Sequence, residues 1–276
     1  MNTLLKRALT GAVFVAVMIG GLYISPYTLF TLFFIINVLS LIEFQTLVNT
    51  FEVNNRVDNP VFEKVAIVVI GSAVYLLTAN WGLHFFDTRY TVLILPLLFL
   101  LFLKELYGQA PVPFLRLSFY LTGIVYLSLP LGLANLLGNW NNTFSPNIVL
   151  AVLLMNWIND SLAYLSGRFL GRTPLFKRIS PKKTWEGSLG GAVFTLLASY
   201  FIAQYVGVFS LGIWLAAAVL VIFFGTWGDL VESMLKRNVG VKDSGNLLPG
   251  HGGILDRFDA FYFLTPFVVA LFYLFA

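Results

Sequence analysis

The chain has 276 residues, of which 58% are hydrophobic and 11% are charged, with a formal net charge of +4. Soluble domains carry roughly 25% charged residues, so this composition excludes an ordinary soluble domain and indicates an integral membrane protein. The sequence contains no cysteine, which excludes disulfides, thiolate catalysis and cysteine-ligated metals.

Apolar stretches long enough to cross a bilayer recur along the whole chain, since a membrane-spanning helix needs about 20 residues. Nine of them can be drawn, at residues 8–25, 26–48, 62–83, 90–108, 114–138, 145–168, 187–207, 211–235 and 256–276. We interpret the first as a retained helix rather than a signal peptide, because no small-residue cleavage pattern follows it. It could also pair with the second as a hairpin that does not fully cross. The expected fold is therefore all-α, a polytopic membrane protein with about nine transmembrane helices.

The distribution of basic residues predicts the orientation of these helices. With nine spans and a cytoplasmic N-terminus, sixteen of the seventeen Lys and Arg residues fall on the cytoplasmic side, and Arg89 alone falls on the other. This asymmetry follows the positive-inside rule, and dropping one helix would invert every later loop. The polar loops 168–186 and 236–257 are thus predicted to face the cytoplasm, where nucleotides are.

Polar chemistry is concentrated in the second half of the chain. We expect an N-terminal region, 1–144, that serves packing or a dimer interface, and a catalytic region, 145–276, that carries both polar loops. Glu43 is the one unusual acid of the first region. Intramembrane acids are often functional, but at the end of a span a structural role is favoured.

A first polar cluster lies in the sixth span, where Asn156, Asp160 and Tyr164 are four apart and share one helix face. An aspartate near the middle of a bilayer costs about 2.5–3.5 kcal/mol, so Asp160 should face a wet cavity, pair with a cation or bind a metal. A packing ladder with Arg168 is the structural alternative. Gly167 and Gly171, also four apart, favour close helix packing.

A second cluster leads into the seventh span and contains Ser180, Lys182, Lys183, Thr184 and Glu186. Thr184 can cap the helix, whose free amides suit phosphate, and the lysines add positive charge beside them. The alternative is a basic loop that follows membrane topology or contacts anionic lipid headgroups.

A third cluster begins in the eighth span with Asp229, which has no obvious partner one turn away. Glu232 and Lys236 have the spacing of an i,i+4 ion pair, which is the favoured interpretation of Glu232. Asp256 and Asp259 are three apart at the start of the ninth span. Helix capping alone would explain one of these two acids. Magnesium prefers one or two carboxylates with waters and substrate phosphates. We predict Mg²⁺, with a second cation left open, bound by Asp229 and Asp256, with Asp259 as a third acid or a partner that supports the ligands.

The stretch from Ser233 to Asp259 reads Ser-x-Leu-Lys-Arg-x4-Lys-Asp-x-Gly-x-x-Leu-Pro-Gly-His-Gly-Gly-Ile-x-Asp-Arg-Phe-Asp. At every specified position it resembles the signature of phosphatidate cytidylyltransferases, also called CDP-diacylglycerol synthases. The motifs at 160–168 and 179–187 are similar to that family too, so the resemblance covers roughly 156–260. It implies that CTP and phosphatidate give CDP-diacylglycerol and pyrophosphate, with magnesium, by attack of the lipid phosphate on the α-phosphorus.

The resemblance and the residue chemistry together define the candidate site. The catalytic candidates are Asp229, Lys236, Arg237, Lys242, Asp243, His251, Asp256, Arg257 and Asp259. The substrate-binding candidates are Asn156, Asp160, Tyr164, Arg168, Ser180, Lys182, Lys183, Thr184, Glu186, Ser233, Pro249, Gly250, Gly252 and Gly253. The implied partners are CTP, phosphatidate and membrane lipids, without nucleic acid, and a homodimer is left open. The short chain suggests a bacterial cytoplasmic membrane, and the distribution of basic residues predicts an active site that faces the cytoplasm.

Two other functions compete with this interpretation. A CTP-dependent lipid kinase of the dolichol or phytol type would release CDP instead of pyrophosphate. A transporter or lipid scramblase would show charges near mid-membrane and internal pseudo-symmetry, whereas the charges here gather at helix ends. The sequence has no P-loop, no dinucleotide-binding fingerprint and no Gly-x-Ser-x-Gly elbow.

Overall fold

The computed structural model describes the chain except residues 1–2, 51–59, 109–110, 248–249 and 251. The chain divides into two compact units. The first comprises Met1–Phe144 and Val239–Arg257, and the second comprises Ser145–Asn238 and Phe258–Ala276. The loop after residue 238 thus belongs with the N-terminal helices, although the sequence analysis assigned it to the C-terminal region.

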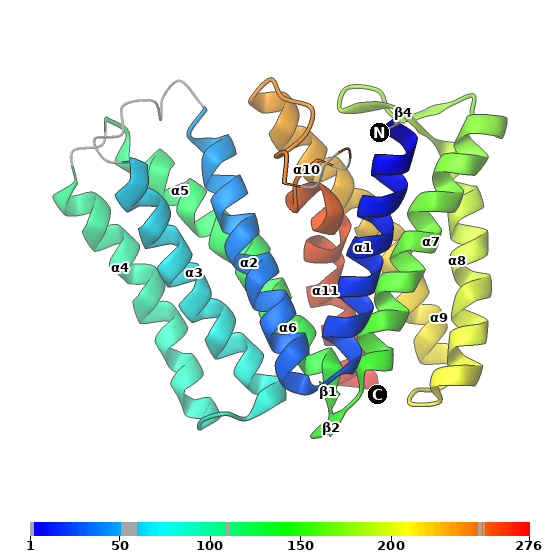
Figure 1. Cartoon of the computed structure of the whole chain (residues 1–276), viewed down its shortest axis with the longest axis horizontal. Helices are drawn as coiled ribbons and strands as arrows, with labels where there is room; N and C mark the ends of the chain where they lie inside the picture. The colour runs from blue at the N-terminus through cyan, green and yellow to red at the C-terminus, as the bar shows by residue number, and fades with distance from the viewer. Residues whose placement is uncertain (1–2, 51–59, 109–110, 248–249, 251) are drawn as a thin grey trace. The chain divides into compact units, whose positions relative to one another are not determined.

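Both units are built almost entirely of helices (Figure 1). Eight helical stretches among the described residues are long and apolar enough to cross a membrane, and a shorter apolar helix, Leu9–Tyr23, precedes them. These stretches are Pro26–Val48, Glu63–Leu83, Thr88–Tyr107, Pro113–Gly138, Pro146–Leu170, Trp185–Val206, Leu211–Asn238 and Leu255–Phe275. The all-α, polytopic membrane fold is confirmed, while the ninth span and the orientation of the N-terminus stay predictions.

The first unit begins with a helical hairpin and continues with further helices. Its elements are α1 (Thr3–Tyr23), α2 (Pro26–Val48), α3 (Pro60–Leu83), the 3-10 segment η2 (Thr88–Leu93), α4 (Ile94–Tyr107), α5 (Pro113–Gly123), the π-helical η3 (Ile124–Ser128), α6 (Leu129–Gly138) and the short strands β1 (Asn139–Trp140) and β2 (Thr143–Phe144). The turn between α1 and α2 is fixed by a capping box, in which Ser25 Oγ accepts from the Thr28 amide and Thr28 Oγ1 accepts from the Ser25 amide.

Buried polar groups connect the helices of this unit at two levels. The Tyr75 hydroxyl of α3 donates to the Phe30 carbonyl of α2 at 2.7 Å and accepts from Asn135 Nδ2 of α6 at 3.1 Å. Near the start of α3, Glu63 pairs with Lys104 of α4 at 2.6 Å and with Arg116 of α5 at 2.5 Å. Because the opposite charges pair with one another, three helices can bring charge together in an apolar unit.

The span that contains α4 differs from the others of this unit in having few protein neighbours. Only 11% of the Thr88–Tyr107 span is buried, against 50% for Glu63–Leu83 and 56% for Pro113–Gly138. Its end is tied to the unit by Lys104, which also pairs with Glu105 at 2.7 Å. Most of the α4 surface therefore faces the surroundings of the unit.

The second unit packs its helices around a close pair. Its elements are α7 (Pro146–Leu170), β3 (Pro174–Phe176), β4 (Ser180–Thr184), α8 (Trp185–Val206), α9 (Leu211–Leu220), the π-helical η4 (Val221–Gly225), α10 (Thr226–Asn238) and the part of α11 (Leu255–Phe275) from Phe258 onward. Helices α7 and α8 run side by side (Figure 1) and make the most extensive helix contact in the described part of the chain.

Glycine lets the α7 and α8 backbones approach each other. A Cβ on Gly187 of α8 would lie 2.7 Å from the carbonyl oxygen of Ala163 and 3.0 Å from Cα of Gly167, both on α7. A Cβ on Gly171 would lie 2.7 Å from the hydroxyl oxygen of Thr184. The helix-packing interpretation of Gly167 and Gly171 is confirmed, as expected for membrane helices that associate through small residues.

This contact predicts opposite effects for two Gly→Ala changes. Gly187→Ala should lower the free energy of unfolding by about 1–3 kcal/mol, because the added methyl group meets backbone that cannot move aside. Gly20→Ala in α1 is the matched control, since nothing lies within 4 Å of its Cβ position. It should be neutral or stabilising by up to about 1 kcal/mol, as a helical glycine is replaced by alanine. Melting temperatures in detergent measure both, and equal shifts would contradict the packing argument.

Candidate functional site

A cavity of about 450 Å³, lined by several charged and polar residues, lies between α7, β4, α8 and α10 of the second unit. Its lining joins residues from all three polar clusters of the sequence. The predicted site residues that line it are Asp160, Tyr164, Arg168, Lys182, Lys183, Thr184 and Asp229. The fold thus brings together side chains that are up to 69 residues apart in the chain, from Asp160 to Asp229.

The β3–β4 hairpin and the start of α8 position the basic residues. The two strands pair in antiparallel register, Pro174 with Thr184 and Phe176 with Ser180. Thr184 caps α8 as predicted, since its hydroxyl oxygen accepts from the Gly187 amide at 3.2 Å. The lysines of β4 therefore precede a helix N-terminus, where the macrodipole favours an anion.

Glu186 fastens the loop that enters this hairpin. Its carboxylate accepts hydrogen bonds from the Arg172 amide at 3.1 Å and from the Thr173 amide at 3.1 and 3.2 Å.

Four substrate-binding candidates of this unit are not among the residues that line the cavity, namely Asn156, Ser180, Glu186 and Ser233. Asn156 lies next to it, because its side-chain amide donates to Asp160 at 3.4 Å.

Asp229 has two partners in this unit. Lys183 Nζ lies 2.5 Å from its Oδ2, and the Ser233 hydroxyl, one turn further along α10, donates to its Oδ1 at 3.2 Å. The prediction that Asp229 lacks a partner one turn away was therefore wrong, because serine was not counted as one. The π-helical segment η4 ends at Gly225, four residues before Asp229. Such segments often occur at functional sites.

Further carboxylates lie close to this pair. The carboxylate of Asp259 in α11 is half-buried. It lies close enough to the acids Asp160, Asp229 and Glu232 for their negative charges to repel it. Glu232 forms an ion pair with Lys236, so its favoured interpretation is confirmed. Over the described residues, no three His, Asp or Glu side chains are grouped as a complete metal-ligand set. Magnesium does not need one, since one or two carboxylates complete its shell with waters and phosphates, and the donor chemistry of Asp229 and Asp259 fits that ion.

The segment Val239–Arg257 is organised separately, within the first unit. Asp256 Oδ2 accepts from the amide and hydroxyl of Ser244, at 2.8 and 2.9 Å, and from the Gly253 amide at 2.8 Å. Gly250 and Gly252 have φ angles of 79° and 83°, which other residues rarely adopt. Asp256 thus belongs to the first unit, whereas Asp229 and Asp259 belong to the second.

The remaining predicted residues of this segment are exposed or lie outside the described residues. Lys242, Asp243, Gly250 and Arg257 are exposed, as is Arg237 at the end of α10. Pro249 and His251 lie outside the described residues. Ser244 was missed by the sequence analysis, because the signature leaves its position unspecified, and so was the cavity-lining Asn159, although it adjoins Asp160.

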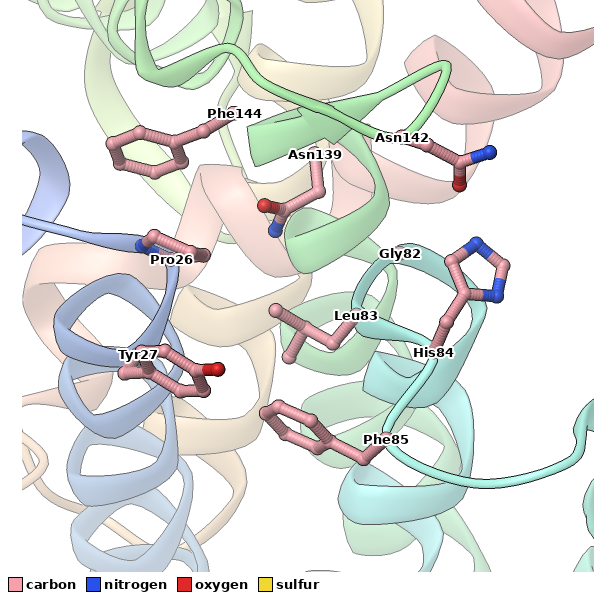
Figure 2. A pocket seen from close by; sticks show the side chains of 9 residues that line it. All are labelled: Pro26, Tyr27, Gly82, Leu83, His84, Phe85, Asn139, Asn142 and Phe144. Atoms are coloured by element: carbon pink, nitrogen blue, oxygen red, sulfur yellow. The ribbon is translucent and has the colours of Figure 1, made fainter.

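A second cavity, of about 580 Å³, lies in the first unit (Figure 2). Its lining comes from the start of α2, the end of α3 and the β1–β2 hairpin, and includes His84, Asn139 and Asn142. None of the predicted site residues is among the described residues that line it. These described residues include one histidine and no lysine, arginine or carboxylate.

The fold and the site together define an integral membrane protein whose lysines and carboxylates gather around one cavity. More narrowly, the chain belongs to the Cytidylyltransferase family, whose profile matches residues 5–275.

Individual relatives carry a more specific name. The chain is 49% identical over 120 residues to a phosphatidate cytidylyltransferase of Staphylococcus haemolyticus. It is 47% identical, over the same length, to proteins of that name from Staphylococcus saprophyticus and Staphylococcus aureus. Each match covers 43% of this chain and 46% of the relative, so it spans about half the length of those proteins.

Proposed function

We propose that the protein is a phosphatidate cytidylyltransferase. It transfers the cytidylyl group of CTP to phosphatidate, which gives CDP-diacylglycerol and pyrophosphate. A phosphate oxygen of the lipid forms the new bond to the α-phosphorus, and the bond from that phosphorus to the pyrophosphate oxygen breaks. The observation that carries this proposal is the shared cavity of Asp160, Lys182, Lys183 and Asp229 in a chain of the Cytidylyltransferase family.

The chemistry requires charge compensation more than proton transfer. The attacking oxygen belongs to a phosphate monoester, which is already anionic at neutral pH, so no strong base is needed. The obstacle is the repulsion between two polyanions, and fixed positive groups lower it most when they are positioned in advance. We assign this role to Arg168, Lys182 and Lys183, of which Arg168 and Lys182 are exposed and Lys183 is half-buried.

We assign magnesium binding to Asp229 and Asp259 of the second unit. From the sequence, Asp229 and Asp256 were predicted as the ligands and Asp259 as a third acid or a supporting partner, and the role of Asp256 stays a prediction. A bound Mg²⁺ supplies neutralisation of phosphate charge and polarisation of the phosphorus. Lys183 holds Asp229 by an ion pair, and that lysine can instead contact a substrate phosphate once the carboxylate binds a cation. The further cations proposed to hold phosphates are Lys236, Arg237, Lys242 and Arg257. The cytoplasmic orientation, the bacterial inner membrane and the homodimer stay predictions.

The test is transfer of label from α-³²P-CTP to dioleoyl phosphatidate by the purified protein in detergent with Mg²⁺. We expect a chloroform-soluble labelled product and one pyrophosphate for each lipid labelled. Release of CDP, with transfer of the γ-phosphate to a polyprenol, would establish the lipid kinase instead. Turnover in detergent, where no compartments exist, would exclude a purely transporting function. No labelled lipid from a folded protein would overturn the proposal.

A further inference from the structure

Glu43, the one unusual acid of the first half, lies against the signature segment within the first unit. It belongs to α2 and is outside the part of the sequence that resembles the family signature. Its carboxylate accepts from the Ile254 amide through Oε1 and from the Leu255 amide through Oε2, both at 3.0 Å. Its Oε2 also lies 3.2 Å from the hydroxyl oxygen of Ser244, a contact between residues 201 positions apart. The fold thus joins an N-terminal helix to the segment with the most specific sequence pattern.

The contacts of Glu43 complete the cap of α11. Three successive amides at the start of this helix, those of Gly253, Ile254 and Leu255, are bound by carboxylates, the first by Asp256 and the other two by Glu43. Such amides have no partner within the helix, so a side chain must satisfy them when they are buried. All three residues are buried, and the negative charges also match the positive end of the helix dipole.

The same carboxylates explain why this segment contains glycine. A Cβ on Gly245 would lie 2.7 Å from Glu43 Oε1, and a Cβ on Gly253 would overlap Glu43 Oε2 and Ser244 Oγ. A Cβ on Gly252 would lie 2.5 Å from an oxygen of the Asp256 carboxylate. Gly245 and Gly253 therefore leave the room that the Glu43 carboxylate occupies.

We propose that Glu43 is a positioning residue for cytidylyl transfer, an inference whose activity readout rests on the proposed function. Glu43 holds the segment at Ser244, Ile254 and Leu255. It thereby fixes the positions of the charged residues that adjoin these three in the sequence. The Ser244 hydroxyl has one proton and lies within hydrogen-bond distance of both Glu43 and Asp256, so it links the two carboxylates. Glu43 itself need not touch substrate.

The first test is Glu43→Gln in the full-length protein, which replaces one accepting oxygen with a donor while keeping the shape. We expect kcat/KM to fall about 10- to 100-fold, the range seen when groups that orient functional residues are changed. Amide hydrogen exchange at Ile254 and Leu255 should become faster. Asp87→Asn is the matched control, because it changes an exposed acid of the same unit and should alter neither readout.

A double-mutant cycle separates positioning from general stability. Gly245→Ala should lower kcat/KM in the natural protein, where the methyl group meets Glu43, and should add little in a Glu43→Ala background. If Glu43→Gln does not fold, Ser244→Ala takes its place, with the same expected direction. Unchanged exchange at Ile254 and Leu255, or unchanged kcat/KM in an active protein, would overturn the proposal. If the natural protein itself transfers no label, the proposed function fails, and the exchange rates still decide whether Glu43 holds the segment.

Discussion

Asp229→Asn is expected to lower kcat for cytidylyl transfer by at least about 100-fold, the scale of losing one preorganised charge-stabilising group. Asparagine keeps the shape of the side chain but removes the charge that pairs with Lys183 and that we assign to magnesium. The Mg²⁺ concentration for half-maximal activity should rise as well. Both values come from lipid labelling at varied Mg²⁺ in detergent.

The interpretation of this result depends on the folded state of the variant. Asp229 is only half-buried, so the melting temperature should change little, and Asp87→Asn again serves as the acid-to-amide control. Full activity of Asp229→Asn at saturating Mg²⁺ would contradict the metal assignment. Loss of activity together with loss of the folded state would call for Ser233→Ala, which removes the neighbouring hydrogen bond without removing charge.

Glu63→Gln is expected to lower the free energy of unfolding by about 3–5 kcal/mol, because breaking a buried ion pair leaves charge uncompensated. Glu63 binds Lys104 and Arg116, and it also accepts from the Tyr120 hydroxyl. After the change, Glu105 is the acid of this cluster that is left to balance the two cations, Lys104 and Arg116. Thermal or denaturant unfolding in detergent measures the loss.

The matched comparison is the exposed ion pair of the same unit. Arg89 and Asp87 have side chains that are 77% and 45% exposed, and exposed pairs contribute roughly 0–1 kcal/mol. Asp87→Asn should therefore leave the unfolding transition almost unchanged. Equal losses in Glu63→Gln and Asp87→Asn would show that burial does not set the strength of the Glu63 cluster.

The helices could be predicted closely because the bilayer leaves few alternatives. Backbone in lipid must satisfy its own hydrogen bonds, so each long apolar stretch becomes a helix. The span predicted at 145–168 is α7 at Pro146–Leu170, and the one predicted at 211–235 extends over Leu211–Asn238. The β3–β4 hairpin and the π segments were not predicted, since strands of three and five residues and local π turns leave no periodic pattern.

The site could be predicted only as separate stripes of side chains. Spacing places Asn156 and Asp160 on one helix face, but it does not show that Lys183 of the hairpin reaches Asp229 of α10. That contact joins two residues that are 46 positions apart in the chain, and no periodic pattern reports it. The part played by Glu43 was beyond sequence reasoning for a similar reason, because its partners lie more than 200 positions away.

The sparse burial of α4 inverts the usual rule for which substitutions a helix accepts. A helix exposed to water tolerates polar side chains and is weakened by large apolar ones, whereas a membrane-spanning helix has lipid as its solvent wherever protein does not cover it. Exchanges among Leu, Ile, Val and Phe on the outward side of α4 should leave the stability of the protein in the membrane almost unchanged. A single charged substitution there costs about 2.5–3.5 kcal/mol near mid-bilayer. Since packing neighbours are few, membrane thickness and the interfacial anchors at its ends govern the tilt and depth of this helix.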